Sequence, residues 1–286
     1  MSKNKNKNYY LYSEAFPPNK KGERKKYAPL SSYHDIIKGI EVQSEKIIYK
    51  PLSKTDIEEV KNLHKEWFPV NYDDDYFQKI FINKYGAYFT LGAYYKIEEK
   101  EIILGLALCE YRPVSEYFAK HTSREAVEEI CKNIDFNEEV QAHLRCEDYN
   151  CVYIMTIGVL DECRQLHIGS KLINKIIEIG MSDNICVGIY LDVVYYNSSA
   201  IKFYENNEFK KVATIKNYYD INDNLYDCEV FLRIFTRKEK DDFRGKHYTF
   251  LRKIINILII TPLNLIYKII IFILLFQCFR NKIKVD

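Results

Sequence analysis

The stretch at residues 153–178, YIMTIGVLDECRQLHIGSKLINKIIE, passes from an apolar strand pattern to an amphipathic helix pattern through one short turn. A second strand and helix are predicted directly after it, at 187–194 and 198–206. Such alternation of strands and helices predicts an α/β fold, with a mixed central β-sheet and helices on its faces.

Hydrophobic periodicity predicts further elements on both sides of this unit. We expect strands near 46–50, 87–96, 102–111, 151–160, 209–218 and 226–235, and helices near 55–66, 73–83 and 169–181. A charged, partly helical insertion at 113–149 interrupts the strands. Together these segments predict one domain at 45–236, which fits the length of the chain.

The two ends of the chain differ from this domain in composition. Residues 1–44 are polar and basic with little apolar periodicity, which predicts a disordered extension, either a solvated tail or a specific binding arm. Residues 237–286 are interpreted as a linker followed by a membrane-binding helical tail. The reason is the run at 254–279, which is almost all apolar and has basic residues on both sides.

The sequence leaves the form of this membrane attachment open. The run is long enough to span a bilayer, but Pro262 interrupts it and Lys268 would be costly at mid-depth. Two short helices lying in the interface, broken at Pro262, avoid that cost. A C-terminal helix docked on the protein's own core is a third interpretation, although the run lacks the polar face of such a helix.

Composition narrows the classes of partner. The formal net charge is only +2, and no nucleic-acid-binding motif is present, so we expect no nucleic-acid partner. The eight cysteines form no C-x-x-C pair, which indicates reduced thiols in a cytosolic compartment and no metal site. The N-terminus has no apolar segment typical of a cleaved signal peptide.

The turn between the central strand and its helix is a candidate anion site. Arg164 and Gly169 are spaced so that the first free N–H groups of the helix would meet at one spot, where the helix dipole also favours an anion. The alternative is an ordinary strand-to-helix turn. His167 weakens the pattern, because its Cβ disfavours a positive φ angle.

This turn resembles the acetyl-CoA motif of the GCN5-related N-acetyltransferase (GNAT) superfamily, with His167 in place of the first glycine. Three further stretches are similar to N-terminal acetyltransferases of the NatE and NatF types: WFPVNY at 67–72, IYLDVVYYNSSAIKFYE at 189–205 and NYY at 217–219. The apolar tail and the insertion favour the NatF type. The resemblance covers about residues 46–235 and implies a GNAT fold.

The resemblance implies roles for many residues, with acetyl-CoA as co-substrate and no metal. The pyrophosphate would be held by Gln165, Leu166, His167, Ile168, Gly169 and Ser170, the thioester carbonyl by backbone around Ile157, Gly158 and Val159, and the thiol end by Asn197, Phe203 and Tyr204. The peptide groove would be lined by Phe68, Pro69, Val70, Tyr72, Met155, Tyr218 and Tyr219. Tyr204 could instead be a core residue, and Trp67 is assigned to the core.

Two residues are expected to handle protons during acetyl transfer. Tyr153 occupies the position of the family's central-strand tyrosine, and Asp192 stands where the family has a histidine. A carboxylate could act as a base through water and would also attract the substrate ammonium. The alternative is that Asp192 is structural and Tyr153 acts alone.

We therefore expect an enzyme that acetylates the α-amino groups of protein N-termini beginning with Met, especially in membrane proteins with cytosolic N-termini. The resemblance implies a place on the cytosolic face of Golgi or another organellar membrane, with residues 254–279 contacting lipid. One alternative is a lysine or histone acetyltransferase. Another is a weakened acetyl-CoA-binding module tethered to a membrane.

Overall fold

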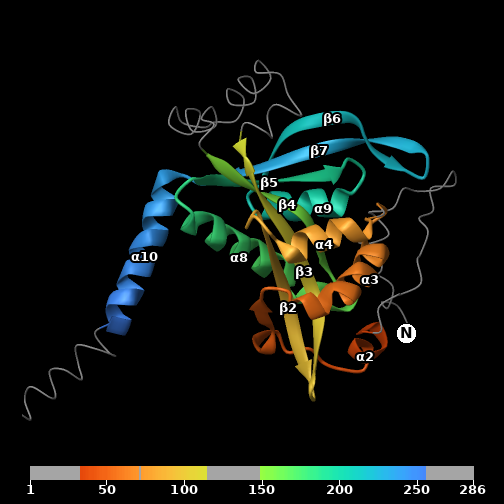
Figure 1. Ribbon diagram of the computed structural model, residues 1–286, viewed down its shortest axis with the longest axis horizontal. Helices are drawn as coiled ribbons and strands as arrows, with labels where there is room; N and C mark the ends of the chain where they lie inside the picture. Colours follow the sequence, from red (N-terminus) through yellow and green to blue (C-terminus); the bar gives the residue numbers. More distant parts are fainter. Residues whose placement is uncertain (1–32, 71, 115–148, 256–286) are drawn as a thin grey trace, which may run out of the picture. The chain divides into compact units, whose positions relative to one another are not determined.

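The computed structural model describes residues 33–70, 72–114 and 149–255, and it divides the chain into one unit that ends at Phe235 and another that begins at Thr236. The first unit contains a seven-stranded sheet in the order β1-β2-β3-β4-β5-β7-β6 (Figure 1). Neighbouring strands are antiparallel except β4 and β5, which are parallel. The prediction of a mixed sheet flanked by helices is confirmed.

The predicted strands are all present, with ends that move by a few residues. The strands are β1 (Ile48–Lys50), β2 (Tyr88–Ile97), β3 (Lys100–Pro113), β4 (Asn150–Val159), β5 (Cys186–Val194), β6 (Lys210–Ile221) and β7 (Asn224–Ile234).

The predicted helices are present too, and short 3₁₀ turns precede several of them. Among the described residues of the first unit, the α-helices are α2 (Tyr33–Lys38), α3 (Ile57–Trp67), α4 (Asp74–Ile82), α8 (Ile168–Ser182) and α9 (Ser198–Asn206), and the 3₁₀ turns are η1 (Ser44–Lys46), η2 (Lys54–Asp56) and η3 (Asp161–Leu166). Buried positions explain α3, because Val60, Leu63, His64 and Trp67 recur at the spacing of one helix face.

The structure corrects one part of the predicted N-terminal extension. Residues 33–38 were expected to be part of a disordered extension, but they form α2, whose Ile37 is only 3% exposed. That part of the prediction is wrong, because the segment is helical and the side chain of Ile37 is buried. Residues 1–32 and 115–148, which include most of the predicted extension and insertion, lie outside the described residues.

The second unit begins with a helix where a linker was expected. This helix, α10, spans Arg237–Ile255, and the side chains of Thr236 and Glu239 cap its first turn reciprocally. None of the helices in the described part of the chain has the length and apolar character needed to cross a membrane. Residues 256–279 of the apolar run lie outside the described residues.

An extra residue in β4 decides which side chains face each layer of helices. Leu108 of β3 pairs with Thr156, but the next residue, Cys109, pairs with Ile154, so Met155 is a β-bulge. Because the bulge shifts the alternation by one residue, Tyr153 and Thr156 lie on the same face, which is the face covered by α3.

A close approach between α3 and β4 explains the glycine at position 158. A Cβ atom at Gly158 would lie 2.1 Å from the Trp67 ring. Only glycine therefore lets the end of α3 lie flat on this strand. On the other face, Ile168 of α8 packs against the position of Gly105 in β3.

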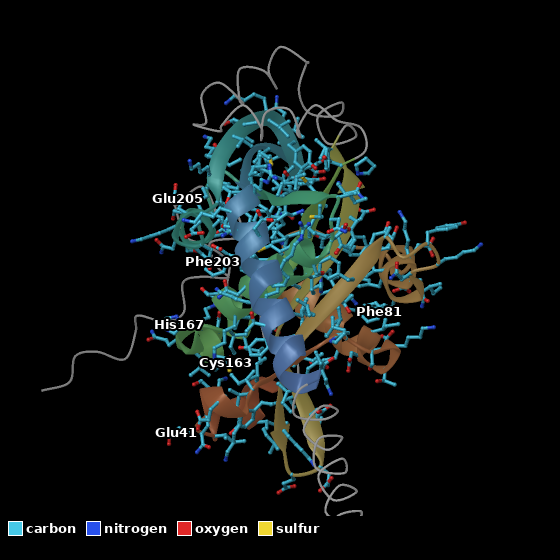
Figure 2. All side chains as sticks on the ribbon, turned by 90° about the vertical axis from the view of Figure 1, so that its left-hand side faces the viewer. Glu41, Phe81, Cys163, His167, Phe203 and Glu205 are labelled. Atoms are coloured by element: carbon cyan, nitrogen blue, oxygen red, sulfur yellow. The ribbon has the colours of Figure 1, made fainter. Side chains whose placement is uncertain are left out.

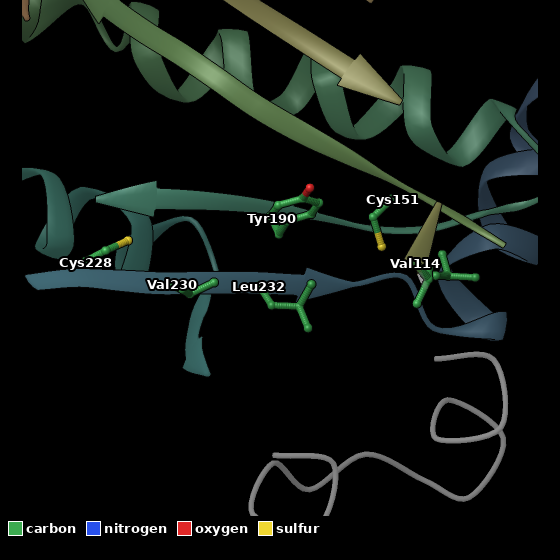
Figure 3. Close-up of a cluster of buried hydrophobic side chains, with 7 residues drawn as sticks. Val114, Cys151, Tyr190, Cys228, Val230 and Leu232 are labelled. Carbon is green, nitrogen blue, oxygen red and sulfur yellow. The ribbon is translucent and has the colours of Figure 1, made fainter. Parts of the chain in front are cut away.

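A cluster of buried side chains joins β4, β5 and β7 beside Asp192. Figure 3 shows Cys151, Tyr190, Val230 and Leu232 of this cluster, and Tyr153 packs against it. The cluster holds the part of β5 that carries Asp192, because Asp192 is opposite Val230 in the ladder to β7.

Candidate active site

A cavity of about 350 Å³ opens where β4 and β5 separate. The ladder between these two strands ends at the pair Ile154 and Leu191, although both strands continue. Loop 68–70 and Tyr72 form one wall, the start of α8 another and α9 a third. The central strand β4 therefore separates from β5 beyond this pair.

Most of the predicted site residues line this cavity. They are Phe68, Pro69, Val70, Tyr72, Met155, Ile157, Gly158, Val159, His167, Gly169, Ser170, Asp192, Asn197, Phe203, Tyr204 and Tyr219. Five predicted residues are not part of its lining: Tyr153, Gln165, Leu166, Ile168 and Tyr218. The roles of all these residues remain predictions.

Asp192 receives hydrogen bonds from two tyrosines. The Tyr153 hydroxyl donates to Oδ2 of Asp192 at 3.1 Å, and the Tyr218 hydroxyl donates to the same oxygen at 3.4 Å. Tyr153 and Tyr218 therefore reach the site through Asp192, although neither lines the cavity. This arrangement brings the two residues expected to handle protons into direct contact.

Burial decides the protonation state of Tyr153. Desolvation raises its pKa well above 10, and the nearby Asp192 carboxylate raises it further. The opposing influence is Arg112, whose guanidinium lies 4.1 Å from the centre of the Tyr153 ring and lowers the pKa. Tyr153 is consequently a protonated hydrogen-bond donor at neutral pH, and Asp192 is the acceptor of the pair.

A bulge in β6 brings two consecutive tyrosines to the same site. Side chains of successive strand residues normally point to opposite faces. In β6 the register jumps between Ile215 and Tyr219, and Asn217 has a left-handed φ of 55°. Asp227 of β7 accepts a hydrogen bond from the N–H of Asn217 at 3.0 Å, which holds this irregular turn of the backbone. As a result, Tyr218 reaches Asp192 while Tyr219 lines the cavity.

The start of α8 has the properties of an anion site. His167 is the N-cap of α8 and makes no side-chain cap, and the first turn contains no acidic residue. The first intrahelical bond runs from the N–H of Lys171 to the carbonyl of His167, which leaves the N–H groups of Ile168, Gly169 and Ser170 without intrahelical acceptors. Those groups and the helix dipole favour an anion here.

His167 adopts the left-handed backbone conformation that a residue with a Cβ atom disfavours. Its φ and ψ are 56° and 24°, in the left-handed region that favours glycine. The backbone of a glycine turn is thus formed with a histidine. Figure 2 shows His167 and Phe203 on the same flank of the molecule.

Side chains of α8 and α9 meet closely beside this turn. A Cβ at Gly169 would lie 3.1 Å from the Phe203 ring, so a larger residue would push into the cavity wall. Ile168 is fully buried, so its side chain belongs to the core and only its backbone could contact a ligand. Gln165 and Leu166 belong to η3.

Asn197 has a structural duty in addition to its place in the cavity. Its side-chain oxygen caps α9 by accepting from the N–H of Ala200 at 3.2 Å. The amide nitrogen is the part of this side chain that remains for a ligand. Tyr204 is both a core residue and a residue of the cavity lining. It is 8% exposed and contacts the rings of Phe209 and Phe231, and it also lines the cavity.

Aromatic rings form the wall on the side of loop 68–70. Phe68 and Tyr72 both contact the ring of His64, with centroid distances of 5.2 and 5.6 Å. Burial raises the pKa of Tyr72 to about 12, so its hydroxyl is protonated. Trp67 is 1% exposed, which confirms its assignment to the core, although it also lines the cavity.

Sequence reasoning missed several residues of the site. Thr156 and Ser199 line the cavity, and Arg164 lines it while pairing with Asp161 at 2.8 Å. Arg112, which lies over the Tyr153 ring, comes from the distant strand β3. Only Arg164 had a sequence signal, its place at the head of the turn motif. In the described part of the chain, no group of His, Cys, Asp or Glu residues is arranged to hold a metal ion.

The fold and this cavity define a class of protein. Residues 57–209, more than half of the chain, match the family model described as the acetyltransferase (GNAT) family. The chain therefore belongs to the GNAT acetyltransferases.

Individual relatives narrow the comparison. The chain is 29% identical over 188 residues to N-alpha-acetyltransferase 60 of Xenopus tropicalis, which covers 65% of this chain and 68% of that protein. It is 23% identical over 188 residues to Histone acetyltransferase MCC1 of Arabidopsis thaliana, covering 65% of this chain and 69% of that protein. The crystal structure of Arabidopsis thaliana NAA60 in complex with acetyl-CoA matches with a TM-score of 0.54 at 24% identity, over 66% of this chain and 98% of that chain, so the two share a fold.

Proposed function

We propose that this protein transfers the acetyl group of acetyl-CoA to the α-amino group of protein N-termini that begin with Met. Membership of the GNAT family supports acetyl transfer. The similarity to N-alpha-acetyltransferase 60 supports the α-amine as acceptor. The apolar wall formed by Phe68, Val70 and Tyr72 suits an unbranched apolar first side chain such as Met.

The residues of the cavity fit acetyl-CoA at three places. The N–H groups at the start of α8 suit its pyrophosphate, and the unpaired edge of β4 suits an extended arm with amide groups. Backbone N–H groups beyond Met155 suit the thioester carbonyl, because preorganised donors stabilise the negative charge that develops there.

The reaction needs one proton to leave the substrate and one to reach the sulfur. The amine nitrogen forms a bond to the acetyl carbon, and the carbon–sulfur bond breaks. The carboxylate of Asp192 takes the proton from the amine, directly or through water, and Tyr153 orients that carboxylate by donating to it. The thiolate that leaves receives a proton through solvent and departs as free CoA, and Asp192 returns the proton it took to solvent. A tyrosine with a raised pKa suits this donor role better than that of a base.

One observation carries the proposal: Asp192, which accepts a hydrogen bond from Tyr153, lines a cavity that is also lined by the start of α8 and loop 68–70. A site for an anion, an apolar groove and a proton acceptor thus converge. A weakened acetyl-CoA-binding module would need the first of these features but not the other two.

Two matched peptides test the proposal. The first has a free N-terminal Met-Leu and no lysine, and the second has the same sequence with an acetylated N-terminus and added lysines. We expect transfer from [¹⁴C]acetyl-CoA to the first peptide only. Transfer to the second alone would favour a lysine acetyltransferase, the alternative supported by the 23% identity to a histone acetyltransferase. Binding of acetyl-CoA with no transfer to either peptide would favour the non-enzymatic module.

We also propose that residues 254–279 attach the protein to the cytosolic face of Golgi or another organellar membrane. The support is the sequence of this run, almost entirely apolar between Arg252–Lys253 and the basic residues that follow it. The resemblance to NatF-type enzymes supports the choice of membrane. Its substrates would then be membrane proteins whose N-termini face the cytosol.

A further inference from the structure

A buried histidine on α3 connects the two sides of the cavity. His64 is 1% exposed, and its Nε2 lies 2.9 Å from the hydroxyl oxygen of Thr156 on β4. Its other ring nitrogen, Nδ1, lies 2.8 Å from the carbonyl oxygen of Val60. The ring also contacts Phe68 and Tyr72, which belong to the cavity wall on the side of loop 68–70.

The hydrogen bonds identify the state of this imidazole. A carbonyl oxygen can only accept, so Nδ1 carries the proton and Nε2 accepts the hydrogen bond from the Thr156 hydroxyl. Burial lowers the pKa of His64 from 6.5 to about 4, so the ring is neutral at physiological pH. Both nitrogens are engaged and the ring is shielded from solvent. His64 is therefore not a base for the substrate amine.

Thr156 lies where β4 is bulged and where its pairing with β5 has ended. It follows the bulge at Met155, and it comes after Ile154, where the ladder to β5 ends. On the β3 side, Thr156 pairs with Leu108. The segment is thus held along one edge by β3 and from the α3 face by His64. A shift of about 1 Å in groups that position reactants can cost about a hundredfold in rate.

We propose that His64 is a positioning residue for the transfer reaction. By accepting the hydrogen bond of Thr156 while packing against Phe68 and Tyr72, it fixes the bulged segment of β4 relative to the wall that the peptide meets. The inference rests on the proposed function, which places the backbone N–H groups for the thioester carbonyl in this segment of β4.

The test is a double-mutant cycle in the full-length protein, read as kcat and KM for the free Met-Leu peptide. Thr156→Val keeps the shape of the side chain but removes its hydroxyl, and His64→Leu removes the acceptor. We expect each to lower kcat by about ten- to a hundredfold, with the acetyl-CoA Kd from calorimetry unchanged within about twofold. The double variant should be no slower than the slower single variant, because both remove the same bond.

Two conservative variants and one control separate positioning from general stability. Thr156→Ser and His64→Gln keep a donor and an acceptor, so they should recover most of the wild-type kcat even if the apolar variants fold poorly. Thr90→Val is the matched control, because the Thr90 hydroxyl accepts from the N–H of Leu52 at 3.1 Å outside the cavity lining. It should lower the melting temperature without lowering kcat.

Each outcome has a distinct meaning. If the wild-type protein is active and Thr156→Val keeps the wild-type kcat, or loses no more of it than Thr90→Val does, the inference is overturned and the proposed function stays intact. Additive losses in the cycle would do the same. A wild-type protein that acetylates no peptide would overturn the proposed function, and the inference with it, before any variant is compared.

Discussion

A carboxylate at position 192 gives the site a proton acceptor that is already held by two tyrosine hydroxyls. Replacing it with the isosteric amide keeps the shape of the side chain but removes the charge and the basicity. We expect Asp192→Asn to lower kcat by about 10²–10⁴, the usual range for loss of a general base. Steady-state kinetics with the free Met-Leu peptide measure this change.

Asp220 offers a matched control for that substitution. It is an exposed aspartate of β6 outside the cavity lining, so Asp220→Asn should leave kcat unchanged. If Asp192→Asn retained wild-type kcat between pH 6 and 9, the residue would be structural. Asp192→His should recover activity if the position needs any base of suitable reach.

The left-handed backbone conformation of His167 predicts how substitutions at this position affect stability. Its left-handed φ of 56° costs a residue with a Cβ about 1–2 kcal/mol, and more when the residue is β-branched. We expect His167→Gly to keep the melting temperature and the acetyl-CoA Kd close to wild type. His167→Val should lower the free energy of unfolding, because a β-branched residue pays more than histidine for this φ angle. A large loss of acetyl-CoA binding in the glycine variant would instead assign the imidazole itself to the anion site.

At the scale of single elements, the bulge in β6 positions Tyr218 and Tyr219 on the side of the cavity that is proposed to hold the peptide. Asp227→Ala removes both the bond to the N–H of Asn217 and the ion pair with Lys216 at 2.6 Å. These same contacts lower the pKa of Asp227. We expect a loss of about 1 kcal/mol in stability, a several-fold higher KM for the peptide and an unchanged acetyl-CoA Kd.

Lys216→Ala separates the two contacts of Asp227, because it removes the exposed ion pair and leaves the backbone bond. Exposed ion pairs contribute little. This variant should therefore keep the wild-type KM. Equal effects of the two variants would show that the bulge does not depend on the bond to Asn217.

The packing of α3 on β4 predicts how stability depends on pH. His64 has a pKa of about 4 in the folded protein, against 6.5 for an ordinary histidine, so the unfolded chain binds its proton first as the pH falls. The contribution of His64 to stability is complete above pH 6.5 and is lost progressively between pH 6.5 and 4. The loss approaches about 3 kcal/mol, because one pKa unit corresponds to about 1.4 kcal/mol.

Thermal unfolding of wild type and His64→Gln at pH 7.5 and 5 measures this contribution. Glutamine does not titrate, so the difference in melting temperature between the two proteins should be smaller at pH 5 than at pH 7.5. A constant difference would show that His64 titrates normally in the folded state.

The sequence predicted the regular elements well and their irregularities poorly. Period-two and helical patterns extend over many residues, so they located every strand and helix of the 45–236 domain that the structure describes. The bulges at Met155 and Asn217 each depend on one or two residues and on the register with a neighbouring strand. No local pattern carries that information. Helix α2 was missed because it is short and stabilised by burial.

At the scale of the whole molecule, the candidate site combines residues that lie far apart in the sequence. The residues that carry a family motif could be proposed from the sequence, and most of them line one cavity. His64, Arg112 and Thr156 could not be proposed in this way. His64 and Thr156 are 92 residues apart in the sequence and meet only in the fold, and Arg112 of β3 meets Tyr153 of β4 only there as well. Such contacts depend on how the sheet is assembled.

The division of the chain at Phe235 and Thr236 suggests how to separate catalysis from attachment. All residues of the candidate site precede this boundary, and the N–H of Phe235 itself bonds to Val187 within the first unit. We expect deletion of residues 236–286 to move the protein from the membrane fraction to the soluble fraction while kcat for the free Met-Leu peptide stays within about twofold of wild type. Fractionation and the peptide assay measure the two effects separately.

A point-substituted full-length protein tests the same proposal without truncation. Replacing Ile270, Phe272 and Leu274 with Asp should detach the protein, because each apolar side chain buried in a membrane contributes about 1.5–3 kcal/mol. If the tail lies in the plane of the interface, a tag placed after Asp286 stays accessible to protease in sealed vesicles, and protection of the tag would instead indicate a spanning helix. A deletion variant that remains on membranes would contradict the attachment through residues 254–279 and would direct the search to the first unit.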